Sequence, residues 1–357
     1  MTHIKDYLRY FCNADFSFSV RCCTFIEYNS IVLSLFRHNL FINSLLLLPY
    51  TIIVRIHSLI YPKAYVSSEL EGWFNCSMFD YLAGLPRLQA VIAILIIFLQ
   101  AVSLNFILNK NRLSLRPNLF PGVFYILFVS ISREYLSLNP ILFGNIFIII
   151  VLVNLFKTYR IAQCSGAIFN IGFFIAMASS FYFPYIAYLI PCFIGLMMLR
   201  SFRLKERVQY LIGAMTFLYL LFAMFFYFDL SVVFYNQYFK SNLPLPEMAA
   251  SSITIYIPLA IFAISIIIAI INYYSIRKKK SIQSQKKIDI LYWVLIFSPF
   301  MILFWNDLNV YSLLVVAIPL SIIVGMLIYR IKNQLVVELL HLVGLVGMIA
   351  FHFGAFL

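Results

Sequence analysis

The residues best suited to chemistry in this chain are one arginine in an apolar stretch and a group of acids that follows it. Arg55 lies near the end of the stretch, and the chain then passes Pro62 and reaches Glu69, Glu71 and Asp80. A carboxylate can act as a general base that removes a proton from a hydroxyl group. It can also hold a divalent cation on a phosphate. We therefore treat Glu71, Glu69 and Asp80 as candidate catalytic residues.

Each of these residues also has an ordinary structural explanation. Glu69 and Glu71 share a face only if the loop is extended, and solvated loop acids are common because charged residues are normally exposed. An arginine inside an apolar segment is costly and points to a functional partner. The alternatives are that Arg55 reaches the membrane interface with its long side chain or makes a structural pair. We take Arg55 as a candidate substrate-binding residue and keep these alternatives open.

A second candidate site lies in the short segment "SREYLSLNP", which runs from Ser132 to Pro140. The planar guanidinium of Arg133 suits a lipid-linked phosphate. Its neighbour Glu134 completes an adjacent pair of opposite charges, and we take both as candidate substrate-binding residues. The alternative is an interfacial anchor, with Tyr135 in the aromatic belt that borders a membrane.

The amino-acid composition indicates which secondary-structure elements position these residues. The chain is 63% hydrophobic and 11% charged, whereas a soluble domain is about half apolar and a quarter charged. Separate apolar runs recur at about 17–23 residues, which is the length that crosses a bilayer as a helix. Because a spanning segment must satisfy its own backbone polar groups, these runs predict helices. The expected fold is an all-α, polytopic transmembrane helix bundle.

Eleven segments have the composition of membrane spans. Because successive spans cross the membrane in opposite directions, their order determines which loops lie on the same side of it. The segments are 41–60, 88–108, 119–132, 140–156, 167–182, 184–199, 209–228, 253–273, 290–305, 311–329 and 334–356. With a cytoplasmic N-terminus, all but five of the 26 basic residues fall inside, the five being Arg55, Lys63, Arg87, Arg133 and Lys240. Basic loops stay in the cytoplasm, so we predict the N-terminus inside and the C-terminus outside. The acids after Arg55 then face the extracytoplasmic side.

The first 40 residues differ from the rest of the chain. Residues 1–40 are mixed and aromatic and carry no cleavable signal pattern. We interpret them as a cytoplasmic or interfacial segment, or as the product of an upstream start codon, and residues 41–357 as one multi-span membrane domain.

Several other classes of protein are disfavoured by the sequence. The net charge of +13 is explained by loops that orient membrane proteins, so we expect the bilayer and no nucleic acid as partner. The six cysteines form no CxxC pair and no metal spacing with histidine, so no metal site is predicted. No organic cofactor is implied, and a divalent cation on the acids is the one candidate. Motifs for ATP-driven motors, HExxH proteases and GxSxG hydrolases are missing from the sequence.

The central region resembles an uncharacterised family of bacterial polytopic inner-membrane proteins, a domain of unknown function. The residues that carry this resemblance are "FLQAVSLNFILNKNRL", "NLFPGVFYILFVSISREYLSLNPILFGNIF", "IFNIGFFIAMASSFYFPYIAYLI" and "MMLRSFRLKE". The resemblance implies a multi-pass protein of the bacterial inner membrane. It implies a membrane topology but no particular activity.

A second resemblance concerns the stretch "VRIHSLIYPKAYVSSELEG". It is similar to the start of GT-C glycosyltransferases, which use polyprenyl-linked sugars and place an arginine, a proline and a pair of acids after the first span. In that superfamily the first-loop acid is catalytic, which carries over to Glu69 or Glu71. Here Glu-Leu-Glu replaces the usual adjacent Asp-Glu pair, and the first loop is short.

These observations lead to one functional expectation and one alternative. We expect a protein of envelope biogenesis, a GT-C-like glycosyltransferase that uses a polyprenyl-phosphate sugar at the periplasmic face. The alternative is a non-catalytic membrane scaffold or a permease.

Overall fold

The computed structural model is helical throughout the part of the chain that it describes, with no strand there. The described residues are 33–63, 65, 79, 81–82, 84–235, 256–278, 280–304 and 310–354. Most of the N-terminal segment 1–40 therefore lies outside them. The all-α class predicted from the sequence agrees with this architecture.

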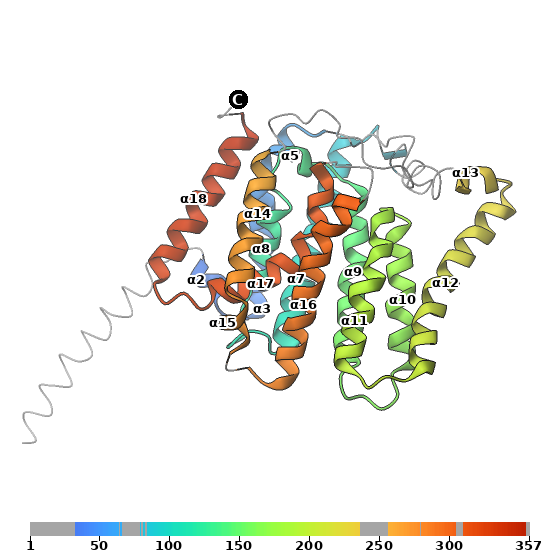
Figure 1. Ribbon diagram of the computed structural model, residues 1–357. Coiled ribbons are helices and arrows are strands. Elements are labelled where there is room, and N and C mark those ends of the chain that lie inside the picture. The colour runs from blue at the N-terminus through green and yellow to red at the C-terminus, as the bar shows by residue number, and fades with distance from the viewer. Residues whose placement is uncertain are drawn as a thin grey trace, which may run out of the picture.

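The helices stand side by side as a bundle (Figure 1). The first half of the chain contains α2 (Leu33–Phe36), α3 (Phe41–Leu45), α4 (Leu47–Val54), α5 (Ile56–Ile60), α7 (Pro86–Lys110), α8 (Phe120–Phe128), η1 (Glu134–Leu136), α9 (Pro140–Lys157) and α10 (Ser165–Ser179). The second half contains η2 (Phe183–Tyr188), α11 (Leu189–Leu199), α12 (Leu204–Tyr227), α13 (Ser231–Tyr235), α14 (Tyr256–Ile271), α15 (Tyr273–Arg277), α16 (Ile282–Phe304), η5 (Val310–Val315), α17 (Ala317–Ile328) and α18 (Gln334–His352).

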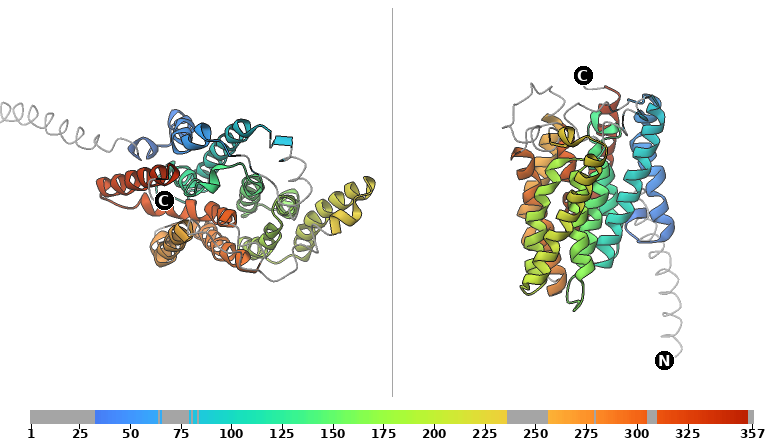
Figure 2. Two further views of the ribbon diagram at one scale, coloured as in Figure 1. Left: turned by 90° about the horizontal axis from the view of Figure 1, so that it is seen from above. Right: turned by 90° about the vertical axis from the view of Figure 1, so that its right-hand side faces the viewer.

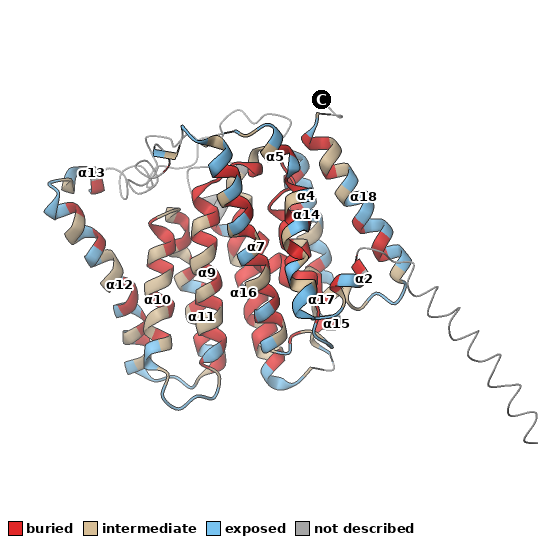
Figure 3. Ribbon diagram, turned by 180° about the vertical axis from the view of Figure 1, so that it is seen from behind, coloured by how far each residue is buried: buried red, intermediate tan, exposed pale blue. Residues whose placement is uncertain are grey.

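Seen from above, the bundle is elongated, with α12 and α13 at one end and α18 at the other (Figure 2). Helices α7, α8, α9 and α17 supply much of the core, and their buried residues are apolar in large part. Burial falls off toward the two ends (Figure 3). In the most apolar stretch of α12 and of α18, 28% is buried, against 56% in α7 and 61% in α9.

Four of the described helices are long and apolar enough to cross a membrane: α7, α9, α12 and α18. Three of them, α7, α12 and α18, carry exposed large apolar side chains, among them Leu99, Tyr219 and Val343. Contiguous exposed apolar surface is avoided in soluble proteins and marks contact with a membrane or a partner. The fold is therefore that of a helical membrane protein, and the predicted total of eleven spans remains a prediction.

Local sequence signals explain where several helices begin. Proline stands in the first turn of α7, α8, α9 and η2, where its missing N–H costs no hydrogen bond. The side chain of Asn139 accepts a hydrogen bond from the backbone N–H of Leu142 at 3.0 Å and so caps α9.

Several predicted spans differ from the helices observed. Segments 184–199 and 311–329 begin with the 3-10 segments η2 and η5. Segment 41–60 is divided into α3, α4 and α5, with breaks at Leu46 and Arg55. Segment 119–132 forms a helix only as far as Phe128, after which the chain turns. The break at Arg55 and the early end of α8 are joined by the Arg55 side chain, whose donors reach Val129 and Ser130. Apolar composition alone carries no signal for such a break.

Helices α10 and α12 approach closely at two glycines. A Cβ atom at Gly172 would collide with the backbone carbonyl of Tyr210, and one at Gly213 would collide with that of Phe169. The nearest atoms are backbone, so neither helix can yield by a side-chain rotation. Small residues at such crossings let helices pack tightly in membranes.

The substitution Gly172→Ala should therefore destabilise the protein, because the added methyl group forces α10 and α12 apart. Overpacking of this kind costs about 1–3 kcal/mol. Thermal unfolding of the purified protein in detergent measures the effect. The matched control is Gly166→Ala on the same helix, where the added Cβ meets nothing within 4 Å. Equal melting temperatures for the two variants would contradict the proposed helix crossing.

Candidate functional site

The basic connections of the chain gather at one end of the bundle, which we call the basic end. It comprises residues 110–118, 157–164, 198–207, 275–287 and 329–333. Hydrogen bonds join these segments: Lys287 Nζ donates to Asn111 Oδ1 at 2.6 Å, and Lys286 Nζ donates to the Met198 carbonyl at 2.9 Å. Arg330 donates to the carbonyls of Ser275 and Ile276. This clustering is what the positive-inside rule requires of loops on one side.

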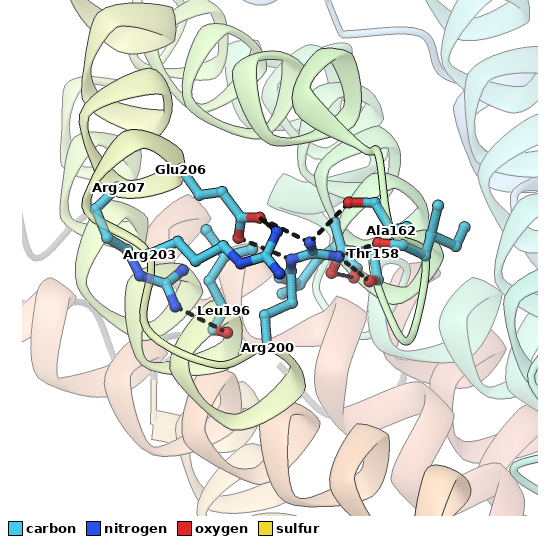
Figure 4. Close-up of polar contacts among 9 residues, drawn as sticks. Thr158, Ala162, Leu196, Arg200, Arg203, Glu206 and Arg207 are labelled. Atoms are coloured by element: carbon cyan, nitrogen blue, oxygen red, sulfur yellow. Dashed lines mark hydrogen bonds and ion pairs between the residues drawn. The ribbon is translucent and has the colours of Figure 1, made fainter.

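The most ordered cluster at the basic end centres on Arg200 and Glu206 (Figure 4). The two side chains form a paired contact, with Nε to Oε2 at 2.8 Å and Nη2 to Oε1 at 2.7 Å. The Arg200 guanidinium also donates to the carbonyl of Thr158 at 3.0 Å. Paired guanidinium and carboxylate groups hold a fixed geometry. Because these donors and acceptors satisfy one another, the cluster fastens the α9–α10 connection to the start of α12.

Arg55 lies toward the opposite end of the bundle, and its side chain is fully buried. Its guanidinium donates to the carbonyls of Tyr135 at 2.9 Å and Val129 at 3.2 Å, and to the Ser130 hydroxyl at 3.4 Å. Arg55 therefore makes a structural pair with the turn that follows α8, which is one of the alternatives that the sequence left open. Its candidate role as a substrate-binding residue stays a prediction.

A polar pocket lies beside this turn, at the same end of the molecule. It has a volume of about 280 Å³. Its walls come from α5, from the residues after it, from the turn at η1 and from η5; they comprise His57, Ser58, Tyr61, Lys63, Arg133, Glu134, Leu136, Ser137 and Tyr311. The structure thus brings two of the candidate substrate-binding residues, Arg133 and Glu134, to one hollow. Lys63 joins them, although the sequence offered no motif that singled it out.

The charged groups that line the polar pocket do not form ion pairs with one another. No ion pair within 4.0 Å involves Arg133, Glu134 or Lys63 among the described residues. The Nε atom of Arg133 is buried and has no hydrogen-bond partner within the part of the chain that the structure describes. A buried polar atom without a partner costs free energy, so it marks a place where a ligand could supply the missing acceptor. The two cations favour an anionic ligand, and a guanidinium suits a phosphate.

The candidate catalytic residues Glu69, Glu71 and Asp80 lie outside the described residues. The chain reaches their segment at Tyr65, whose ring centroid lies 5.6 Å from that of the pocket residue Tyr311. The backbone N–H of Tyr65 donates to Gln89 Oε1 at 2.9 Å, which fixes this point against α7. Among the described residues, no group of three or more His, Cys, Asp or Glu side chains could hold a metal ion.

A buried polar network ties the central helices together. The Tyr125 hydroxyl donates to Gln100 Oε1 at 2.8 Å, and the Tyr185 hydroxyl donates to Asn145 Oδ1 at 2.5 Å. Asn145 in turn donates to the Tyr125 oxygen at 3.3 Å. Polar side chains between membrane helices act in this way as interhelical contacts. The sequence shows the amides but not their tyrosine partners, which come from distant segments.

Three polar contacts hold α18 against the other helices. The backbone N–H of Leu33 donates to the Glu338 carboxylate at 3.1 Å, and His341 Nε2 lies 2.8 Å from the Tyr50 hydroxyl. Near the other end of α18, His352 Nε2 lies 2.7 Å from the Ser130 carbonyl. Glu338 and His341 therefore serve as contacts between segments, in agreement with the interhelical role that their spacing suggests.

The fold defines a helical protein with four described helices that are long and apolar enough to cross a membrane. The chain belongs to a family of unknown function, DUF6427, whose family model matches residues 74–356. None of the curated proteins and none of the solved structures matches the chain. The expected membership of an uncharacterised family is thus confirmed.

Replacing Arg55 with alanine should lower stability, because three oxygen acceptors lose their donors in a buried site. Hydrogen bonds to charged groups contribute about 1.5–3 kcal/mol each to stability. Thermal unfolding in detergent should show a clear loss for Arg55→Ala. The matched control Arg87→Ala removes an exposed arginine near the same end and should melt as the wild type does. An unchanged melting temperature for Arg55→Ala would contradict its structural role.

Proposed function

We propose that this protein is a multi-pass protein of the bacterial inner membrane that binds a lipid-linked phosphate in the polar pocket. The observation that carries the proposal is the unpartnered guanidinium nitrogen of Arg133 beside the cation of Lys63. Both residues are among the few basic side chains away from the basic end. With the basic end in the cytoplasm, the pocket opens on the extracytoplasmic side.

We propose further that the bound lipid is a polyprenyl-phosphate sugar and that the protein is a GT-C-like glycosyltransferase of envelope biogenesis. An acceptor hydroxyl would attack the anomeric carbon, forming the new C–O bond. The bond from that carbon to the phosphate oxygen would break, and the polyprenyl phosphate would leave with the electron pair. Glu71 or Glu69 would take the hydroxyl proton as general base, with Asp80 as a second acid or a partner of a divalent cation.

The remaining site residues have distinct parts in this proposal. Arg133 would bind the phosphate and offset the charge that develops on it as it leaves. Glu134 would orient a sugar hydroxyl by accepting a hydrogen bond. Arg55 would act as a positioning residue, since it holds the turn from which Arg133 and Glu134 extend. Much of the rate would come from holding the acceptor hydroxyl against the base.

A non-catalytic scaffold is the second candidate, and the buried network of Tyr125, Asn145 and Tyr185 favours it. A fully satisfied polar core rigidifies a fold and needs no cavity. A permease is less well supported, because it should place ionisable groups near the centre of several spans. The clearest such groups here, Arg55 and Glu338, lie near opposite ends of the bundle and are engaged by backbone groups.

Mass spectrometry of envelope glycolipids and surface glycans tests the proposal in a deletion strain. The deletion should remove one sugar, which wild-type protein restores. Arg133→Ala should restore at most about a tenth of it, since loss of one charged contact in the transition state costs about tenfold or more. Glu71→Gln should restore none if Glu71 is the base. The matched control Arg87→Ala should restore the sugar fully.

Three results would argue against parts of this proposal. An unchanged glycan profile in the deletion strain would favour the scaffold. Normal activity in both Glu71→Gln and Glu69→Gln would remove these acids from the site. Full activity of Arg133→Ala would remove the polar pocket as the phosphate site. Each variant should first be shown to reach the membrane in wild-type amounts.

A further inference from the structure

A long apolar groove separates α18 from the rest of the bundle. Its volume is about 580 Å³, within the range of about 300–1,000 Å³ that is usual for ligand sites. Helices α8, α14, α17 and α18 form its walls, through apolar side chains such as Phe128, Ile261, Val324, Leu340 and Met348. Figures 1 and 2 show α18 at the edge of the molecule, next to these helices.

The polar contacts of α18 with the bundle lie near its two ends, and the groove runs between them. Those contacts are Glu338 and His341 at one end and His352 at the other. Gly344 and Gly347 lie between them and line the groove. A Cβ atom at either glycine would meet nothing within 4 Å. The two glycines therefore widen the groove and are not needed for close helix packing.

The length of the groove indicates how long an occupant it takes. On α18 its lining runs from Val337 to Phe351, which corresponds to about 21 Å at the helical rise of 1.5 Å per residue. The hydrocarbon core of a bilayer is about 30 Å thick, so one leaflet is about 15 Å deep. The groove is thus longer than one leaflet is deep, and it has room for a hydrocarbon chain extended along α18.

One end of the groove adjoins the polar pocket. Ile131 lines the groove, and Arg133, two residues later, lines the pocket. Phe351 lines the groove, and the ring of its neighbour His352 lies 6.2 Å from that of the pocket residue His57. The turn after α8 and His352 thus lie close to both hollows. A ligand with an anionic head and a long apolar tail would match the cations of one and the apolar walls of the other.

We propose that the groove holds the hydrocarbon chain of the lipid whose phosphate the polar pocket binds. The inference rests on the proposed function for the placement of the phosphate. The apolar walls hold the chain by van der Waals packing, while Lys63 and Arg133 select an anionic head. Gly344 and Gly347 leave the space that the chain occupies.

Binding of polyprenyl monophosphates of long and short chain to the full protein in nanodiscs tests this inference, with inorganic phosphate as a third probe. The groove is filled by Gly344→Leu combined with Gly347→Leu. The matched control is Gly166→Leu, which adds the same side chain at another open glycine. Arg133→Ala removes the head contact. Thermal unfolding establishes that each variant is folded before binding is measured.

The wild type should bind the long chain at least tenfold more tightly than the short one. The double leucine variant should lose that preference and keep its affinity for the short chain and for phosphate, and Gly166→Leu should bind as the wild type does. Affinity independent of chain length, or unchanged in the double variant, would overturn the groove assignment and leave the phosphate site standing. Long-chain binding that needs the glycines but not Arg133 would overturn the phosphate site, and with it the proposed function.

Discussion

The hydrogen bonds of the buried Arg55 side chain are the contacts on which the candidate site depends. Its guanidinium joins the break between α4 and α5 to the turn that follows α8, where helical hydrogen bonding ends. Carbonyls freed at such a break must find donors inside a membrane protein, because lipid offers none. Arg55 supplies these donors to Val129 and Tyr135, and the chain between them carries Arg133 into the polar pocket. A charge that is costly to bury is thus stabilised by the backbone groups that it organises.

The two ends of the bundle use their charges in different ways. At the basic end, Arg200 and Glu206 engage each other, and lysines and arginines donate to the carbonyls of neighbouring connections. These charges hold loops together, although two buried guanidinium nitrogens of Arg207 have no hydrogen-bond partner among the described residues. At the opposite end, Lys63, Arg133 and Glu134 surround a hollow without pairing within 4.0 Å among the described residues. An end whose charges remain available is the better place for a ligand.

Much of the fold could be predicted from the sequence, because long apolar runs identify membrane helices by composition. The all-α class, the helix starts at prolines and the clustering of basic loops all follow from local signals. The breaks at Leu46 and Arg55 and the early end of α8 could not be predicted. The break at Arg55 and the end of α8 are linked by the distant carbonyls that the Arg55 side chain reaches, and the length of an apolar run does not contain that information.

The candidate site was predictable only in part. Arg133 and Glu134 stand out as charges in a short turn, and the structure places both at the polar pocket. Lys63 carries no motif, and it joins them because α5 ends beside η1. The apolar groove was not foreseen at all, since its walls come from α8, α14, α17 and α18 and no stretch of sequence encodes the gap. Glu69, Glu71 and Asp80 remain candidates from the sequence.

The central claim is that the polar pocket opens on the extracytoplasmic side while the basic end faces the cytoplasm. Labelling with a membrane-impermeant maleimide tests it most directly, with single cysteines at Lys63 and at Lys205 in a protein whose native cysteines are replaced. Both positions are exposed, so sidedness alone should decide the outcome. We predict that the cysteine at position 63 reacts in intact spheroplasts and that the one at position 205 reacts only after permeabilisation. The reverse pattern would place the pocket in the cytoplasm and contradict the account.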